Sequence, residues 1–182
     1  MKRADSAEDL VSSVVVWDIF IRIFHWSLVV AFASAYLSSD AGAIHHWFGY
    51  VVIGLISARL IWGVVGTKYA RFVNFVPSPA RFSAYMKDLQ ASREPRYLGH
   101  NPAGGAMIVM LLFMLGATGG TGWLLTTDMF WGSDIIEGLH AVCANTVLAL
   151  IGVHLAGVAL ASWRHRENLV KAMFTGRKRM DE

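Results

Sequence analysis

Cysteine is nearly absent from this sequence: Cys143 is the only one in 182 residues. A single cysteine cannot form an internal disulfide, and it excludes both a zinc site built on thiolates and the Cys-x-x-Cys-His attachment of c-type haem. Charged residues are also scarce, at 16% of the chain against about 25% in ordinary soluble domains. So low a content of charged residues argues against a soluble globular domain.

Apolar residues are abundant instead, at 55% of the chain, with a mean hydropathy of +0.46. A membrane-spanning helix needs about 20 mostly apolar residues, and four stretches qualify. They cover approximately residues 20–37, 44–65, 103–125 and 138–163. We expect no cleavable signal peptide, because residues 1–18 contain four acidic residues and no apolar core. The sequence predicts an all-α integral membrane four-helix bundle, with residues 1–182 as a single membrane domain.

Basic residues indicate how these helices are oriented. Of the 16 Lys and Arg, three lie before or at the start of the first stretch, six between the second and third, and six after the fourth. The two short connections contain no Lys or Arg and only the acidic residues Asp40, Asp128, Asp134 and Glu137. Positive charge stays in the cytoplasm, so we expect both termini and the long connection to be cytoplasmic. Membrane orientation, rather than nucleic-acid binding, explains the net charge of +3.

The long connection contains a predicted helix at about residues 79–91. Ser78 followed by Pro79 is a favourable helix start. An apolar stripe at helical spacing follows, formed by Phe82, Tyr85, Met86 and Leu89. With Arg81 and Lys87 nearby, this helix either lies on the inner membrane surface or packs against the base of the bundle.

Five of the seven histidines fall inside the apolar stretches: His25, His45, His46, His140 and His154. Ionisable groups within membrane spans are costly and usually mark function. The last two are 14 residues apart, which is about 21 Å along a helix and nearly four whole turns. Their rings therefore point to nearly the same face but cannot share one metal ion. Each needs a partner on another helix.

The expected orientation supplies these partners. His140 lies near the outer surface, at the depth of the His45–His46 doublet, whereas His154 and His25 both lie near the inner surface. Two such pairs at two depths suit two flat cofactors, each ligated from both faces, and haem iron takes axial imidazole ligands. A zinc transporter is the rival use of these histidines. It would also need Asp or Glu at mid-membrane, and the sequence has none there.

Two arginines lie at the depth of the inner histidine pair. Arg59 is the only Lys or Arg deep within a stretch, 14 residues after His45. An unpaired charge there is costly, and a haem propionate is a natural partner for it. Arg22, one turn before His25, is placed to do the same. The alternative is a side chain that snorkels to the inner surface, which suits Arg22 better than Arg59.

Four short motifs follow one another along the chain. They are Val16-Trp17-Asp18 with Arg22, His25 and Trp26; His45 with Gly49-Tyr50, Arg59-Leu60, Trp62-Gly63 and Gly66; Gly99-His100-Asn101-Pro102; and His140 with His154. In this order and topology, nearly all of residues 14–175 resembles the bacterial cytochrome b561 family, which includes the b-type cytochrome subunits of nickel–iron hydrogenases.

The resemblance implies a four-helix membrane bundle with two non-covalent b haems. It implies axial ligands at His25, His45, His140 and His154. It favours His45 over His46, because the family ligand precedes the glycine of its motif by four residues. His100 resembles a structural loop residue of the family rather than a ligand.

Members of this family pass electrons between quinone in the membrane and a partner redox protein. The leading hypothesis is therefore a di-haem electron-transfer cytochrome, surrounded by lipid in the bacterial inner membrane. Its expected partners are quinone and a c-type cytochrome, hydrogenase or dehydrogenase subunit. The alternative is a superoxide:quinone oxidoreductase, although superoxide is an anion and the outer end has no Lys or Arg to steer it. A haem-free membrane anchor is the third hypothesis.

Overall fold

The computed structural model describes residues 13–180, in which the chain forms seven helices and two short strands. The elements in chain order are β1 (Ser13–Val15), α2 (Ile19–Leu37), α3 (Ala43–Val65), α4 (Phe72–Phe75), α5 (Pro79–Gln90), α6 (Pro102–Leu124), α7 (Asp134–Arg164), α8 (Leu169–Thr175) and β2 (Arg177–Arg179). Some charged residues on which the expected orientation and the expected lack of a signal peptide depend lie outside the described part of the chain. They are Lys2, Arg3, Asp5, Glu8 and Asp9.

Within residues 13–180, four helices are long and apolar enough to cross a membrane, namely α2, α3, α6 and α7. Their bounds agree closely with the four predicted stretches. The largest difference is at α7, which begins at Asp134 rather than at residue 138. Between 11% and 22% of the most apolar window of each helix is buried inside the protein. Few of their residues are fully buried, large apolar side chains are exposed on all four helices, and the predicted all-α membrane bundle is confirmed.

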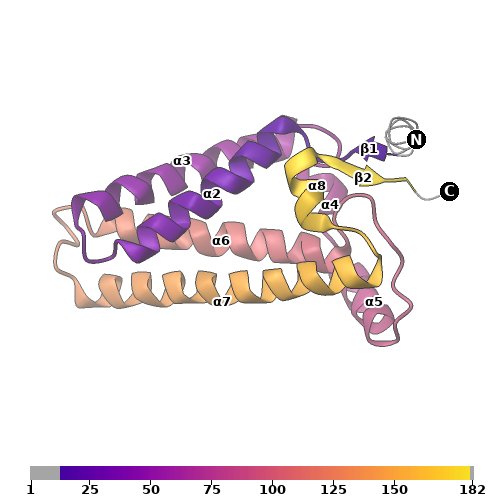
Figure 1. Ribbon diagram of the computed structural model, residues 1–182. Coiled ribbons are helices and arrows are strands. Elements are labelled where there is room, and N and C mark those ends of the chain that lie inside the picture. Colours follow the sequence, from indigo (N-terminus) through magenta and orange to yellow (C-terminus); the bar gives the residue numbers. More distant parts are fainter. Residues whose placement is uncertain (1–12, 181–182) are drawn as a thin grey trace.

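The four long helices form two pairs (Figure 1). Helix α2 packs along α3, and α6 packs along α7. The two pairs meet mainly through α3 and α6, whereas α2 and α7 share no comparable interface in the described structure. The core between the helices contains Phe24, Ala31, Val52, Ile56, Leu112, Leu115 and Val147. The two helices that carry His25 and His154 are thus joined less closely than their neighbours, with the Tyr36 hydroxyl of α2 donating to Asn145 Oδ1 of α7 at 2.9 Å.

The short elements gather at one end of the bundle (Figure 1). Strand β1 pairs antiparallel with β2, with Ser13 opposite Arg179, so both ends of the described chain meet there. Ion pairs join the long connection to the C-terminal part of the chain. They link Arg96 to Glu167 at 2.9 Å and Arg164 to Glu94 at 2.6 Å. The other end consists of the two short connections between α2 and α3 and between α6 and α7.

Helix α5 packs on the base of the bundle. The Ser78 hydroxyl accepts from the Arg81 N–H at 3.3 Å, and Pro79 is the first helical residue. Tyr85 is only 5% exposed, and its ring meets that of Tyr97 at 6.0 Å between centroids. Contacts with α6 complete the packing. Its buried side therefore faces protein.

A single carboxylate, Asp18, holds the start of α2. Its Oδ1 accepts from the Ile21 N–H at 2.9 Å, as an N-cap does. Its Oδ2 accepts from Trp62 Nε1 at 3.1 Å and from the Thr67 hydroxyl at 2.6 Å, which joins α2 to the end of α3. Burial raises the pKa of Asp18, but the hydrogen bonds from Thr67, Ile21 and Trp62 outweigh it, and the net pKa is lower than usual.

Gly63 of α3 lies against the segment that follows the helix, and a Cβ there would overlap the ring of Phe72. We expect Gly63→Ala to destabilise the protein by about 1–3 kcal/mol, the usual cost of overpacking. The matched control is Gly54→Ala in the same helix, where a Cβ would meet nothing within 4 Å. The measurement is the thermal unfolding midpoint in detergent. Equal midpoints for the two variants would contradict the prediction.

Candidate functional site

The structure brings together His45 of α3 and His140 of α7 toward the end of the bundle formed by the short connections. Their ring centroids are 6.0 Å apart, and the ring planes are inclined at 82°. Two imidazoles bound to opposite sides of one metal ion, each through a bond of about 2 Å, have their ring centres about 6 Å apart. The observed separation therefore suits two axial ligands of one iron.

Both rings are held through their Nδ1 atoms. Nδ1 of His45 lies 2.9 Å from the carbonyl oxygen of Ala35, and Nδ1 of His140 lies 3.0 Å from that of Thr118. A carbonyl oxygen can only accept, so each Nδ1 carries the proton and each Nε2 keeps its lone pair. Histidines that bind metals donate their other ring N–H in this way. The donor set at this end therefore fits haem iron.

Helix α6 supports His140 although it contains no histidine. The Thr121 hydroxyl lies 3.2 Å from Nδ1 of His140. A Cβ at Gly122 would lie 3.0 Å from Cε1 of the same ring, so a missing side chain at this position lets the ring approach α6. Sequence reasoning missed both residues, and the run of glycines and threonines over residues 116–122 was the only available signal.

The inner histidines, His25 on α2 and His154 on α7, are not in ring contact. The His25 ring packs edge-on against Trp26 at 5.0 Å, and its buried Nδ1 has no hydrogen-bond partner among residues 13–180. His154 likewise makes no hydrogen bond or ring contact within the described chain. A buried imidazole nitrogen without a partner is costly. A group bound between His25 and His154 would satisfy it.

Arg59 is buried at the inner end, with 3% of its surface exposed. Its Nη2 donates to the Ala70 carbonyl at 3.0 Å, and its guanidinium carbon lies 4.8 Å from the centroid of the Phe72 ring. Its Nη1 is buried and has no partner in the described structure. Arg59 therefore does not snorkel to water, and it keeps one donor for a further acceptor.

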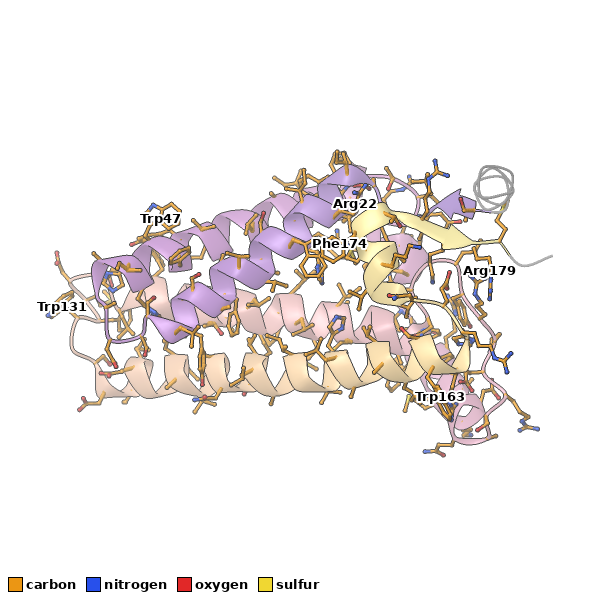
Figure 2. The ribbon with its side chains drawn as sticks, viewed as in Figure 1. Arg22, Trp47, Trp131, Trp163, Phe174 and Arg179 are labelled. Atoms are coloured by element: carbon orange, nitrogen blue, oxygen red, sulfur yellow. The ribbon has the colours of Figure 1, made fainter. Side chains whose placement is uncertain are left out.

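Arg22 lies beside α8 (Figure 2). A Cβ at Gly176, the residue that ends α8, would lie 3.3 Å from Cδ of Arg22. Its Nε is buried without a hydrogen-bond partner in the described residues. Phe174 stacks on Trp26 at 4.2 Å, with 18° between the ring planes. Helix α8 thus covers the part of α2 that precedes and follows His25.

Two further histidines of the sequence have different surroundings. His46 is exposed, and its ring centroid lies 6.0 Å from that of His45. The ring of His100 packs against Trp17 at 4.5 Å and Phe75 at 4.8 Å. Burial, followed by the nearby charges of Arg59 and Lys178, lowers the pKa of His100 to about 3. His100 is therefore neutral at physiological pH.

Comparison with known families decides the identity. The family profile of prokaryotic cytochrome b561 matches residues 16–176. The chain belongs to this family. As a prokaryotic cytochrome b561 it is a multi-pass bacterial membrane protein that binds haem b and takes part in electron transfer, which confirms the predicted family. No significant match was found among curated proteins or among solved structures.

The candidate ligands of this cytochrome b561, His45 and His140, suit haem better than a bare ion. Within residues 13–180, no group of three or more His, Cys, Asp or Glu side chains could hold a metal ion. Haem needs fewer protein ligands, because the porphyrin supplies the others and the protein supplies axial imidazoles. The pair His45 and His140 meets that need.

Proposed function

We propose that this cytochrome carries electrons across the bacterial inner membrane between the quinone pool and a redox partner, through two b haems. One haem is held by His45 and His140, and the other by His25 and His154. The observation that carries the proposal is the facing pair His45 and His140, with both Nδ1 atoms bonded to backbone carbonyls. The chain acts as one membrane domain in this proposal.

Haem iron, when bound, supplies a one-electron carrier. The side chains of the protein would hold the haem, exclude water from it and set its potential. The Nδ1–H bonds of His45 and His140 orient their rings and raise their basicity as ligands. The unpartnered Nδ1 of His25, and the absence of ring contact between His25 and His154 in the described structure, support a second site. Because the quinone–quinol couple exchanges two electrons and two protons, each turnover requires two successive single-electron transfers with the partner.

The proposed orientation places the end with β1, β2, α5 and α8 in the cytoplasm. The opposite end contains four acidic residues and no Lys or Arg in its two connections, as expected for a surface outside the cytoplasm. Trp47 and Trp131 lie toward that end and Trp163 toward the other (Figure 2), and all three are exposed. Tryptophan is enriched at both membrane interfaces. The acidic end suits a basic partner, such as a c-type cytochrome or an electron-transfer subunit.

The haem content of the purified protein tests the proposal. A pyridine haemochrome assay is expected to give two haems per chain, and a short-chain quinol is expected to reduce both. One haem or none at full occupancy would contradict the two-site proposal. If superoxide reduces the haems but quinol does not, the proposed electron transfer from quinol to haem is contradicted.

Arg59 and Arg22 are proposed to pair with propionates of the inner haem, because each has a buried nitrogen without a partner in the described chain. Arg59→Leu is expected to lower the potential of that haem by about 30–60 mV, a threefold to tenfold shift in its equilibrium, since a nearby cation favours the reduced form. The outer haem, about 21 Å away, should change much less.

Redox titration of each haem measures this effect. The control is Arg59→Lys, which keeps the charge and should keep most of the potential. If both potentials are unchanged in Arg59→Leu, Arg59 contacts no propionate and has only its structural contacts with Ala70 and Phe72.

A further inference from the structure

Thr121 is a buried polar side chain in the membrane-spanning part of α6, with 8% of its surface exposed. Its Oγ1 lies 2.8 Å from the carbonyl oxygen of Ala117 and 3.0 Å from that of Thr118. It also lies 3.2 Å from Nδ1 of His140. A hydroxyl has one proton, and carbonyls only accept. The hydroxyl therefore donates to its own helix, and its lone pair accepts from Nδ1–H of His140.

The Nδ1–H of His140 is thus shared between two acceptors, the Thr121 hydroxyl and the Thr118 carbonyl at 3.0 Å. Donation to the helix polarises the hydroxyl and strengthens it as an acceptor. The histidine that faces His140 is held differently, because Nδ1 of His45 has one acceptor, the Ala35 carbonyl at 2.9 Å. One turn of α6 therefore sets the position of the His140 ring.

We propose that Thr121 is a positioning residue for His140 that lowers the potential of the haem ligated there. The inference rests on the proposed ligation by His140 and names the residue that tunes that site. An acceptor on Nδ1–H makes the imidazole a stronger electron donor through Nε2. A stronger donor stabilises the oxidised iron more than the reduced iron, and hydrogen bonds around the ligands are among the means by which proteins set haem potentials.

Thr121→Val removes the hydroxyl and keeps the shape of the side chain. We expect the potential of one haem to rise by about 30–60 mV, a threefold to tenfold shift in the ferric–ferrous equilibrium. We also expect that haem to bind about tenfold more weakly, as is typical when the outer partner of a metal-binding histidine is lost. Redox titration measures the first effect, and transfer of haem to an acceptor protein measures the second.

Two variants separate the hydrogen bond from packing. Thr121→Ser keeps the hydroxyl and should restore the wild-type potential. Thr146→Val in α7 is the matched control, since the Thr146 hydroxyl also donates to a carbonyl of its own helix, that of Val142 at 2.8 Å, and supports no histidine in the described structure. This change should leave both potentials unchanged. Thr121→Ala is the second hydroxyl-free variant if Thr121→Val does not accumulate.

The result that overturns the inference is an unchanged potential in the hydroxyl-free variants with both haems retained. An equal shift in Thr146→Val, or a potential in Thr121→Ser that differs from wild type as much as that of Thr121→Val, would overturn it as well. The proposed ligation fails in a different way, through retention of both haems in His140→Ala. The two failures are therefore distinguishable.

Discussion

Replacing His140 with alanine is expected to remove one haem per chain and to leave the other in place. The ring of His140 faces that of His45 at 6.0 Å, so its loss leaves a single imidazole at that end of the bundle. The inner histidines lie about 21 Å deeper along the helix axis and should still hold their haem. Pyridine haemochrome analysis should fall from two haems per chain to one, and the remaining haem should stay low-spin.

Two substitutions control this prediction. His45→Ala should have the same effect as His140→Ala, because both rings belong to one proposed pair. His46→Ala should keep both haems low-spin, because the His46 ring is exposed and does not contact the His140 ring. A high-spin signal in the His46 variant would show that His46, and not His45, is the ligand. Two retained haems in His140→Ala would contradict the pairing.

Replacing Asp18 with alanine is expected to cause the largest loss of stability that does not involve a haem ligand. The change removes the N-cap of α2 and leaves the donors of Trp62 and Thr67 without their acceptor. We expect a cost of about 2–4 kcal/mol at pH 7, from a lost cap and two lost bonds to a charged group. The thermal midpoint in detergent measures it. Asp40→Ala is the control, because Asp40 is exposed and makes no hydrogen bond in the described chain.

The effect of Asp18 should depend on pH in a defined direction. Its folded-state pKa is lower than its ordinary value, which is about 3.9. The ionised form therefore stabilises the fold above that pH, and its contribution is lost as the pH falls through the folded-state pKa. The difference in thermal midpoint between wild type and Asp18→Ala should be largest near pH 7 and should shrink below pH about 4. A constant difference across this range would contradict the role of the ionised carboxylate.

The sequence by itself determined the number of spanning helices and their bounds. The length of a membrane span is a one-dimensional property, because about 20 apolar residues cross the hydrocarbon region whatever they pack against. The scarcity of charge and the four apolar runs were therefore sufficient. The order of the motifs was also sufficient to predict the family, and the match over residues 16–176 confirms that prediction.

The depth of each histidine followed from the sequence, but the contacts of its ring did not. The expected orientation of the spans, together with helical rise, placed the His45–His46 doublet at the level of His140 and left the choice within the doublet to the family resemblance. Only the tertiary structure brings the ring of His45 against that of His140 and leaves His46 exposed. It also keeps His25 and His154 out of ring contact, because α2 and α7 pack together less closely than the neighbouring helices do.

Tertiary structure alone decided which residues support the site. Thr121 and Gly122 are on the one spanning helix without a histidine, so no motif pointed to them, and they reach His140 only because α6 packs along α7. The depth of Arg59 could be predicted. Its hydrogen bond to the Ala70 carbonyl and the position of its guanidinium over the Phe72 ring depend on how the segment after α3 folds back against that helix. Such contacts join residues distant in sequence, and the rotation and packing of whole helices determine them.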